Sequence, residues 1–282
     1  MTKKEAINNL RNSLENAGFI EADMDARLLM EYIAGVTRNE LFIRGDEELP
    51  LEKWNELSIA LDKRLKHIPL QYITGYQNFM GLEFRVNEHV LIPRQDTEIL
   101  VEEVIKQGFS GLDILDMCTG SGCILLSLLK YVYGCRGVGV DISEKALEVA
   151  KNNSKELDIP ATLIQSDLFD NIDSNEKFDV IVSNPPYIKT DVISGLMEEV
   201  RDHEPMLALD GDYDGLKFYR KITEKSVDYL RIGGMLFFEI GYDQGEDVVK
   251  IMENEGFEEI RIVKDLSGLD RVVVGTRRNY VR

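Results

Sequence analysis

The chain has 282 residues, a formal net charge of −18 at pH 7 and a pI of about 4.7, and 44% of its residues are hydrophobic. That length suits one large domain, alone or with a small one, and the hydrophobic share is too high for a disordered chain. A transmembrane helix is excluded, because no run of about 18 apolar residues occurs, and the acidic charge argues against a protein that grips nucleic acid through phosphates.

The cellular compartment is suggested by two negative features of the sequence. The basic residues near the start are followed by no apolar run, so no secretory signal is expected. The three cysteines, Cys118, Cys123 and Cys135, form no CxxC pair and no disulfide framework, which is typical of a reducing compartment. The expectation is a cytoplasmic protein.

The first 75 residues predict a small helical domain. Apolar residues recur there at helical spacing in several short runs, and glycines break the runs. Residues 1–85 carry 11 Lys+Arg and 14 Asp+Glu, whereas 86–282 carry 22 and 37, so most of the negative charge lies in the second part. Residues 76–92 alternate loosely between apolar and polar, with Gly81 at a turn position, and predict a β-hairpin linker.

Residues 93–282 predict an α/β domain with a Rossmann-like, mostly parallel sheet, because strands alternate with helices of ten to fifteen residues. The expected strands are 113–117, 137–141, 161–165, 179–183 and 235–240. The expected helices are 123–133, 143–157, 218–230 and 246–256. The closing strands 259–263 and 271–275 have no helix between them, so an antiparallel pair is expected at the edge.

A glycine loop opens the helix after the first of these strands. It comprises Cys118, Thr119, Gly120, Ser121 and Gly122. Glycine suits a tight turn that must approach a ligand closely, although a strand-to-helix turn alone can also require it. A dinucleotide fingerprint needs a third glycine three residues later, where a leucine stands.

Three acids at successive strand ends indicate which ligand the loop binds. Asp141 lies 21 residues after Gly120, where a carboxylate can hold a ribose diol, and Asp167, followed by Leu168, is placed to meet an adenine. Asp116 lies before the loop, where it would favour a positive centre and repel a pyrophosphate. Together they predict S-adenosylmethionine, which has a ribose, an adenine and a cationic sulfur but no phosphate.

The most specific motif is Asn184-Pro185-Pro186-Tyr187, directly after the apolar strand over 179–183. The two prolines fix an extended turn, which leaves the Asn184 side-chain oxygen and the Pro185 carbonyl free to accept two hydrogen bonds from one planar NH2 group. Tyr187 is expected to offer an aromatic face to that group. We predict that Asn184, Pro185 and Tyr187 are catalytic, that all four residues bind substrate, and that Asn184 also contacts the cofactor.

With this motif and the glycine loop, the chain resembles the amino-methyltransferases, and within them the release factor glutamine methyltransferases, or PrmC/HemK family. Further segments that match family signatures lie along nearly the whole chain: 70–75, 90–98, 204–209, 214–216, 239–241 and 264–271. Two positions depart from the pattern. Cys118 stands where many members carry glycine, and Leu168 stands where some carry an aromatic residue.

The resemblance implies methyl transfer from S-adenosylmethionine to the side-chain nitrogen (N5) of the glutamine in the Gly-Gly-Gln motif of class 1 peptide chain release factors. The N-terminal helices would then dock the protein substrate. Neither a metal site nor a membrane partner is expected, nor stable binding to nucleic acid, and a monomer is the expected state. The three histidines lie in no motif and are expected to be surface or packing residues.

Two other functions remain open at this point. An N6-adenine nucleic-acid methyltransferase can use the same Asn-Pro-Pro-Tyr motif to bind the amino group of a flipped base. Such an enzyme needs a basic groove for the strand, which this acidic segment does not suggest. A non-catalytic protein that binds release factors could keep a cofactor fold, but the intact glycine loop, Asp141 and Asn184 argue against it.

Overall fold

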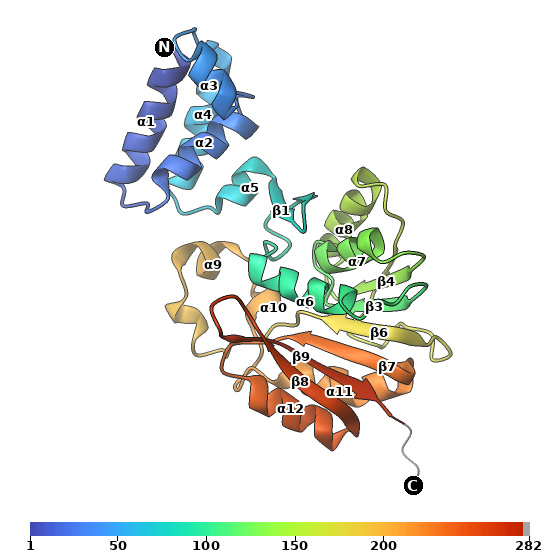
Figure 1. Cartoon of the computed structure of the whole chain (residues 1–282). Helices are drawn as coiled ribbons and strands as arrows, with labels where there is room; N and C mark the ends of the chain where they lie inside the picture. Colours follow the sequence, from blue (N-terminus) through green and yellow to red (C-terminus); the bar gives the residue numbers. More distant parts are fainter. Residues whose placement is uncertain (279–282) are drawn as a thin grey trace. The chain divides into compact units, whose positions relative to one another are not determined.

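The computed structural model describes residues 1–278, which form two compact units (Figure 1). The first unit is Met1–Tyr76 together with Met197–His203, and the second is Gln77–Leu196 together with the chain from Glu204 onward. A segment that follows the Asn-Pro-Pro-Tyr motif in sequence therefore packs with the N-terminal helices. No helix in the described part of the chain could cross a membrane.

The first unit is helical, as predicted. Its helices are α1 (Lys3–Asn16), α2 (Ala22–Tyr32), α3 (Arg38–Arg44), α4 (Leu51–Arg64), α5 (Leu70–Thr74) and α9 (Glu198–His203). The core contains Leu10, Leu14, Leu29, Met30 and Leu57, all without solvent exposure. Because these residues recur at helical spacing, their burial accounts for the amphipathic pattern of the sequence.

Arg64 joins α9 to the N-terminal helices inside this unit. Its Nε lies 2.7 Å from the Asp25 carboxylate of α2, and its Nη2 lies 2.8 Å from Glu199 of α9. The guanidinium also lies over the Phe19 ring, 4.5 Å from its centroid. Helix α9 was not predicted, because a six-residue charged helix has too few apolar positions to show a period.

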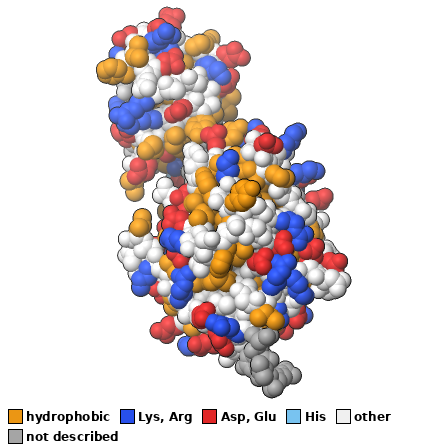
Figure 2. Space-filling view, turned by 45° about the vertical axis from the view of Figure 1, so that its right-hand side comes forward, with side chains coloured by type: hydrophobic (Ala, Val, Ile, Leu, Met, Phe, Trp, Pro, Cys, Tyr) orange, Lys and Arg blue, Asp and Glu red, His pale blue; other side chains and the backbone are white. Residues whose placement is uncertain are grey.

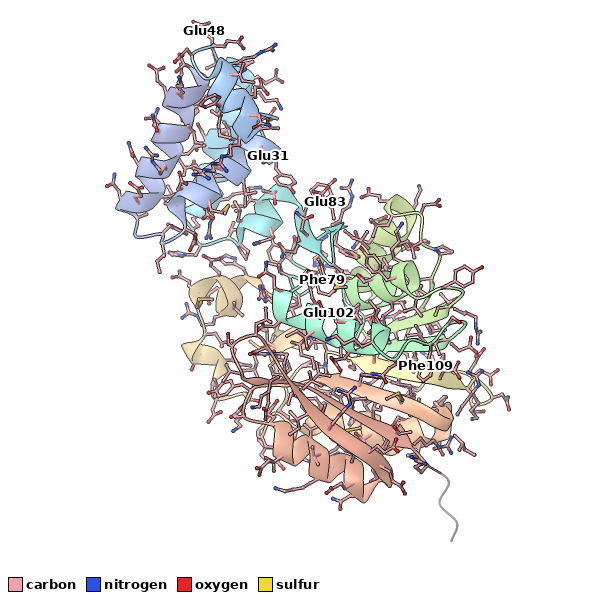
Figure 3. All side chains as sticks on the ribbon, in the orientation of Figure 1. Glu31, Glu48, Phe79, Glu83, Glu102 and Phe109 are labelled. Carbon is pink, nitrogen blue, oxygen red and sulfur yellow. The ribbon has the colours of Figure 1, made fainter. Side chains whose placement is uncertain are left out.

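The predicted hairpin is formed by β1 (Tyr76–Phe79) and β2 (Leu82–Arg85). Its two-residue turn is Met80-Gly81, and both residues have positive φ, 50° and 70°, which is the backbone that a tight hairpin favours. Phe79 and Phe84 are buried in the core of the second unit, and Phe79 lies between the hairpin and α6 (Figure 3).

The second unit is built on a seven-stranded sheet, which confirms the predicted α/β fold. The strands are β3 (Asp113–Met117), β4 (Arg136–Asp141), β5 (Thr162–Gln165), β6 (Phe178–Ser183), β7 (Leu230–Glu239), β8 (Phe257–Lys264) and β9 (Asp270–Arg277). Their spatial order is β5-β4-β3-β6-β7-β9-β8. Strand β9 is antiparallel to both neighbours, so the reversed strand lies second from the edge and β8 is the edge strand itself.

Helices cover both faces of the sheet (Figure 1). Those on one face are α6 (Gln95–Ile105), α7 (Cys123–Tyr131) and α8 (Glu144–Glu156); those on the other are α11 (Lys217–Tyr229) and α12 (Gly245–Asn254). Alternate strand residues point to opposite faces, so Ile114 belongs to one hydrophobic cluster and Leu115 to the other. Gly137 must stay small, because a Cβ there would come 2.7 Å from Leu125 of α7.

Helix α6 and the short helices η1 (Ile193–Gly195) and α10 (Met206–Leu209) were not predicted. Helix α6 buries Leu100, Val101 and Val104, which form an apolar stripe wide enough to predict a helix. The helix begins, however, inside a sequence motif whose residues also belong to the site. The two short elements have fewer than two turns, too short for a periodic pattern.

Candidate active site

A cavity lies where the carboxyl ends of β3, β4 and β6 meet. Strands β3 and β6 are neighbours although β4 and β5 come between them in sequence, so this is the switch point at which open α/β sheets bind ligands. The cavity has a volume of about 320 Å³. Its wall includes these predicted site residues: Cys118, Thr119, Gly120, Ser121, Asp141, Asp167, Leu168, Asn184 and Pro186.

The glycine loop turns by placing several residues in the left-handed region. Cys118 has φ of 62° and Gly120 has φ of 55°, so a glycine at position 118 would suit the same backbone. Gly122 does not line the cavity; a Cβ there would come 3.3 Å from Ala150 Cβ. Its small size serves helix packing rather than ligand contact.

Asp141 is the residue around which the loop folds. Its Oδ2 accepts a hydrogen bond of 2.9 Å from the Gly120 amide, and its Oδ1 accepts one of 2.9 Å from the Ser143 amide. Burial raises the pKa of Asp141, and these backbone donors partly offset that effect. The carboxylate thus belongs to the cavity wall and to the loop's own structure.

The chemistry of this wall fits a phosphate-free ligand. The Gly120 amide, which could face a pyrophosphate, is taken by Asp141, and the Thr119 amide donates to the Val140 carbonyl at 2.9 Å. Two acids of the wall, Asp141 and Asp167, would repel a phosphate near them, and the wall also contains the cations Arg94, Lys217 and Lys221. The two acids and the occupied loop amides suit the ribose hydroxyls and the cationic sulfur of S-adenosylmethionine.

Asp116 occupies a different place from the one its sequence position suggests. It is fully buried, it accepts a hydrogen bond of 2.5 Å from the Thr119 hydroxyl, and it does not line the cavity. Its Oδ1 has no hydrogen-bond partner among the described residues. Desolvation raises the pKa of Asp116 to about 7. Its direct role is therefore to support the loop from beneath.

Replacing Asp116 with Asn should flatten the pH dependence of stability. Because the carboxyl has a pKa of about 7 in the folded chain against the usual aspartate pKa of 3.8, the folded state binds the proton more tightly. The stabilisation is complete below pH ~4 and is lost as the pH rises through 7, by up to about 4 kcal/mol. Urea unfolding at pH 5 and pH 8 measures this; equal pH dependence in wild type and variant would contradict it.

The Asn-Pro-Pro-Tyr motif leaves β6 at the cavity. The Ser183 hydroxyl donates to the Met117 carbonyl at 2.6 Å and joins the ends of β6 and β3. The Asn184 Nδ2 donates to the Thr97 Oγ1 at 3.4 Å. Pro185 is buried and outside the cavity wall, and its carbonyl accepts no hydrogen bond from the described residues.

Tyr187 does not line the cavity with Asn184. Its hydroxyl lies 3.4 Å from Glu239 Oε1, and its carbonyl accepts a hydrogen bond of 3.0 Å from Gln244 Nε2. Burial and the nearby Glu239 raise the pKa of Tyr187. Gly215 must be a glycine, because a Cβ there would come 2.4 Å from the Tyr187 carbonyl oxygen. In this structure Tyr187 anchors the motif.

Several residues of the site were missed by reasoning from the sequence. His89, expected as a surface or packing residue, lines the cavity, as does Thr97. Arg94, also in the wall, donates through Nη2 to both carboxylate oxygens of the buried Glu204, at 2.6 and 2.7 Å. Glu239 is visible in the sequence as an acid that ends an apolar strand, and the structure places it outside the cavity wall. No group of three or more potential metal ligands occurs within residues 1–278.

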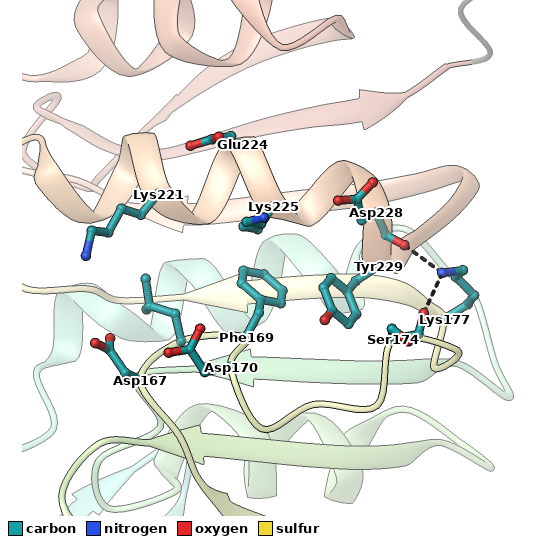
Figure 4. Close-up of a pocket in the computed structure, with 11 residues that line it drawn as sticks. Asp167, Phe169, Asp170, Ser174, Lys177, Lys221, Glu224, Lys225, Asp228 and Tyr229 are labelled. Carbon is teal, nitrogen blue, oxygen red and sulfur yellow. Dashed lines mark hydrogen bonds between the residues drawn. The ribbon is translucent and has the colours of Figure 1, made fainter.

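A second depression lies beside the first and shares Asp167, Leu168 and Lys221 with it (Figure 4). Phe169 and Tyr229 stack at its centre, 4.7 Å between ring centroids. The Lys177 ammonium there is bound to two backbone carbonyls, those of Ser174 and Asp228. These two bonds join the loop at Ser174 to α11. Because no residue of the glycine loop or of the Asn-Pro-Pro-Tyr motif lines this depression, the candidate functional site is the cavity at the strand ends.

Two family models match the chain: the PrmC N-terminal domain over residues 5–75 and the methyltransferase small domain over 94–212. The release factor glutamine methyltransferase of Caulobacter vibrioides is 41% identical, with 98% of this chain and 97% of that protein covered. The enzyme of the same name from Clostridium acetobutylicum is 42% identical, with 90% of each covered. A methyltransferase structure from Pyrococcus furiosus, 16% identical, covers 71% of this chain and 90% of its own with a TM-score of 0.52, a likeness of fold alone.

Proposed function

The chain belongs to the release factor glutamine methyltransferase family, and from that premise we propose that it methylates the side-chain amide nitrogen (N5) of the glutamine in the Gly-Gly-Gln motif of class 1 peptide chain release factors. S-adenosylmethionine is the proposed methyl donor, and translation factors as substrates agree with the cytoplasm as the compartment. The observation that carries the proposal is Asn184, which lines the same cavity as the glycine loop and Asp141.

In this proposal, different cavity residues bind different parts of the cofactor. Asp141 accepts hydrogen bonds from the ribose hydroxyls, and Asp167 with Leu168 meets the adenine. The cofactor supplies an electrophilic methyl group on a sulfonium, so the chain need not activate a leaving group. Asp116 supports the loop from beneath, and its carboxyl group is buried from solvent.

The difficulty of the reaction lies in the nucleophile, because an amide nitrogen shares its lone pair with its carbonyl. Asn184 Oδ1 and the Pro185 carbonyl accept the two amide hydrogens and aim the nitrogen at the methyl group. Fixing two reactants in this way can contribute ~7–11 kcal/mol in favourable cases. The same two acceptors stabilise the positive charge that develops on nitrogen, and the extra proton then leaves to water.

The alternative function, methylation of nucleic acid, would require a basic surface that binds the phosphate backbone. Figure 2 shows acidic and basic side chains interspersed on the visible face of the second unit, with no broad basic tract. Incubation with labelled cofactor and either a release factor or adenine-containing DNA separates the two functions. We expect label on the release factor alone; label on the DNA alone would overturn the proposal.

We also infer that the first unit binds the body of the release factor. No residue of Met1–Tyr76 lines the cavity, so this unit is free of cofactor binding. Its helix α3 presents two adjacent apolar side chains to solvent, Phe42 and Ile43, which are 88% and 76% exposed. Adjacent exposed apolar groups mark interaction sites more often than single ones do.

Replacing Phe42 and Ile43 together with Ser should raise KM for an intact release factor by about tenfold, equivalent to ~1.4 kcal/mol. A short peptide that contains the Gly-Gly-Gln motif should keep its KM, since it lacks the body of the release factor that the first unit is proposed to bind. Leu266→Ser, a fully exposed residue of the second unit, serves as the control. An unchanged KM for the intact factor would place the docking surface elsewhere.

A further inference from the structure

Helix α8 carries a carboxamide on its buried face. The other buried residues of this face are Ala146, Val149 and Ala150, whereas Asn153 brings a polar side chain there that is only 1% exposed. A polar group away from water costs free energy unless its hydrogen bonds are made inside the protein. An apolar residue would pack this face equally well, so the hydrogen-bond partners of Asn153 must explain why a polar group stands there.

Three hydrogen bonds hold the Asn153 side chain, all of them to backbone atoms. Its Oδ1 accepts from the Arg85 amide at 2.7 Å. Its Nδ2 donates to the Arg85 carbonyl at 3.1 Å and to the Ser121 carbonyl at 2.9 Å. Both N–H groups of the carboxamide are thus used, and a reversed carboxamide would set its oxygen against two carbonyls. The three bonds therefore fix one orientation of the side chain.

These partners belong to two segments with different roles. Arg85 ends β2 of the hairpin, through which the chain passes from the first unit into the second. Ser121 belongs to the glycine loop and lines the cavity. We propose that Asn153 is a positioning residue of the cofactor site, which holds the glycine loop through the Ser121 carbonyl and makes the hairpin part of the loop's support. This inference rests on the binding of S-adenosylmethionine proposed above.

The packing of α8 places Asn153 beside the loop. A Cβ at Gly122 would come 3.3 Å from the Cβ of Ala150, so the helix and the loop are in close contact there. Ala150 and Asn153 are three positions apart and therefore lie on the same side of the helix. One face of α8 thus both packs against the loop and binds its backbone.

The bond from Asn153 supports a part of the loop that its other contacts do not reach. The two residues before Ser121 are bound through their amides, by the Val140 carbonyl and the Asp141 carboxylate at the end of β4. Asn153 instead binds a carbonyl, and it does so from the opposite side of the sequence, on α8. Ser121 is 3% exposed, so loss of this donor leaves a buried carbonyl unsatisfied and favours a rearranged loop.

The hairpin is itself fixed at its turn. The Met80 amide donates to Glu98 Oε1 of α6 at 2.6 Å, and the Tyr131 hydroxyl of α7 donates to the Met80 carbonyl at 2.6 Å. With Arg85 bound to α8, the hairpin is tied to three helices, and Asn153 extends this support to the loop. Linkage requires the reverse effect as well, so a cofactor that stabilises the loop must also stabilise the bonds to Arg85.

Asn153→Leu tests the positioning role in the full-length enzyme. Leucine has nearly the volume of asparagine and removes all three hydrogen bonds. We expect the Kd for S-adenosylhomocysteine, measured by calorimetry, to rise about 10–100-fold, as when a buried carbonyl loses its donor. The kcat at saturating S-adenosylmethionine should stay within about threefold, because the Asn-Pro-Pro-Tyr motif is unchanged. A merely structural role predicts the opposite pattern: less folded enzyme, hence a lower kcat, with an unchanged Kd.

Glu156→Gln is the matched control on the same helix. It removes the exposed ion pair of 2.6 Å between Glu156 and the Arg85 side chain and leaves the backbone bonds of Arg85 in place. Its Kd should stay within about twofold of the wild type. A wild-type Kd in folded Asn153→Leu, or an equal rise in both variants, would overturn the positioning role and leave the proposed function intact.

A measurement on the wild-type enzyme does not depend on whether the variant folds. The Arg85 amide donates to Asn153 Oδ1, so its hydrogen exchange reports on that bond. Bound S-adenosylhomocysteine should slow exchange of the Arg85 amide and leave that of Leu269, an amide bound to Asp265 in the β8–β9 turn, unchanged. Equal exchange of the Arg85 amide with and without S-adenosylhomocysteine would overturn the link. If the wild-type enzyme binds no S-adenosylhomocysteine, the inference falls together with the proposed cofactor.

Discussion

Asn184→Ala should lower kcat about 10²- to 10³-fold, the loss typical when one hydrogen-bonding group that stabilises developing charge is removed. The alanine removes the acceptor for one hydrogen of the substrate amide and leaves the Pro185 carbonyl alone to orient the nitrogen. Cofactor affinity should change only a few-fold, because Asp141 and the glycine loop remain. Single-turnover kinetics with saturating cofactor measures the loss.

The control for this variant is Asn152→Ala, an exposed position on α8 that makes no hydrogen bond through its side chain in the described structure. It should keep wild-type turnover. If Asn184→Ala itself keeps wild-type turnover, Asn184 does not orient the substrate amide for the reaction.

Asp141→Asn is expected to weaken the binding of S-adenosylmethionine about 10–100-fold. The carboxylate now accepts from both Gly120 and Ser143 amides, and a carboxamide of the same shape has only one accepting atom for them. Hydrogen bonds to a charged group contribute ~1.5–3 kcal/mol each, and 1.4 kcal/mol is tenfold in affinity. The ribose would lose its charged acceptor as well.

Calorimetric titration with S-adenosylmethionine measures this effect. Asp170→Asn is a suitable control, because this exposed acid lines only the neighbouring depression. If the dissociation constants of Asp141→Asn and the wild type agree, the ribose lies elsewhere in the cavity.

The sequence best predicts those parts of the site whose backbone geometry depends on a few neighbouring residues. The glycine loop and the two prolines each constrain φ or remove an N–H within a few residues, so their geometry is visible in the chain itself. The alternation of strands and helices likewise predicts the sheet, because each element carries its own period. The carboxyl ends of β3, β4 and β6 then bring Thr119, Asp141 and Asn184 to one cavity.

What sequence did not predict depends on contacts between distant residues. Thr97 and Asn184 are separated by 87 positions in the chain, and only the fold brings them to one cavity, where their side chains share a hydrogen bond. Tyr187 lies next to Asn184 in the motif, yet the packing of the 211–215 segment and Gln244 against its backbone directs it to Glu239 rather than to the cavity. Asp116 is likewise drawn beneath the loop by Thr119.

The most direct measurement is a crystal structure of the enzyme with S-adenosylhomocysteine and a peptide that contains the Gly-Gly-Gln motif. We expect the glutamine Nε2 to lie about 2.7–3.2 Å from both Asn184 Oδ1 and the Pro185 carbonyl oxygen, with Asn184 Nδ2 still turned to Thr97. A glutamine amide bound elsewhere, or one that meets Asn184 Nδ2 instead of Oδ1, would contradict the account.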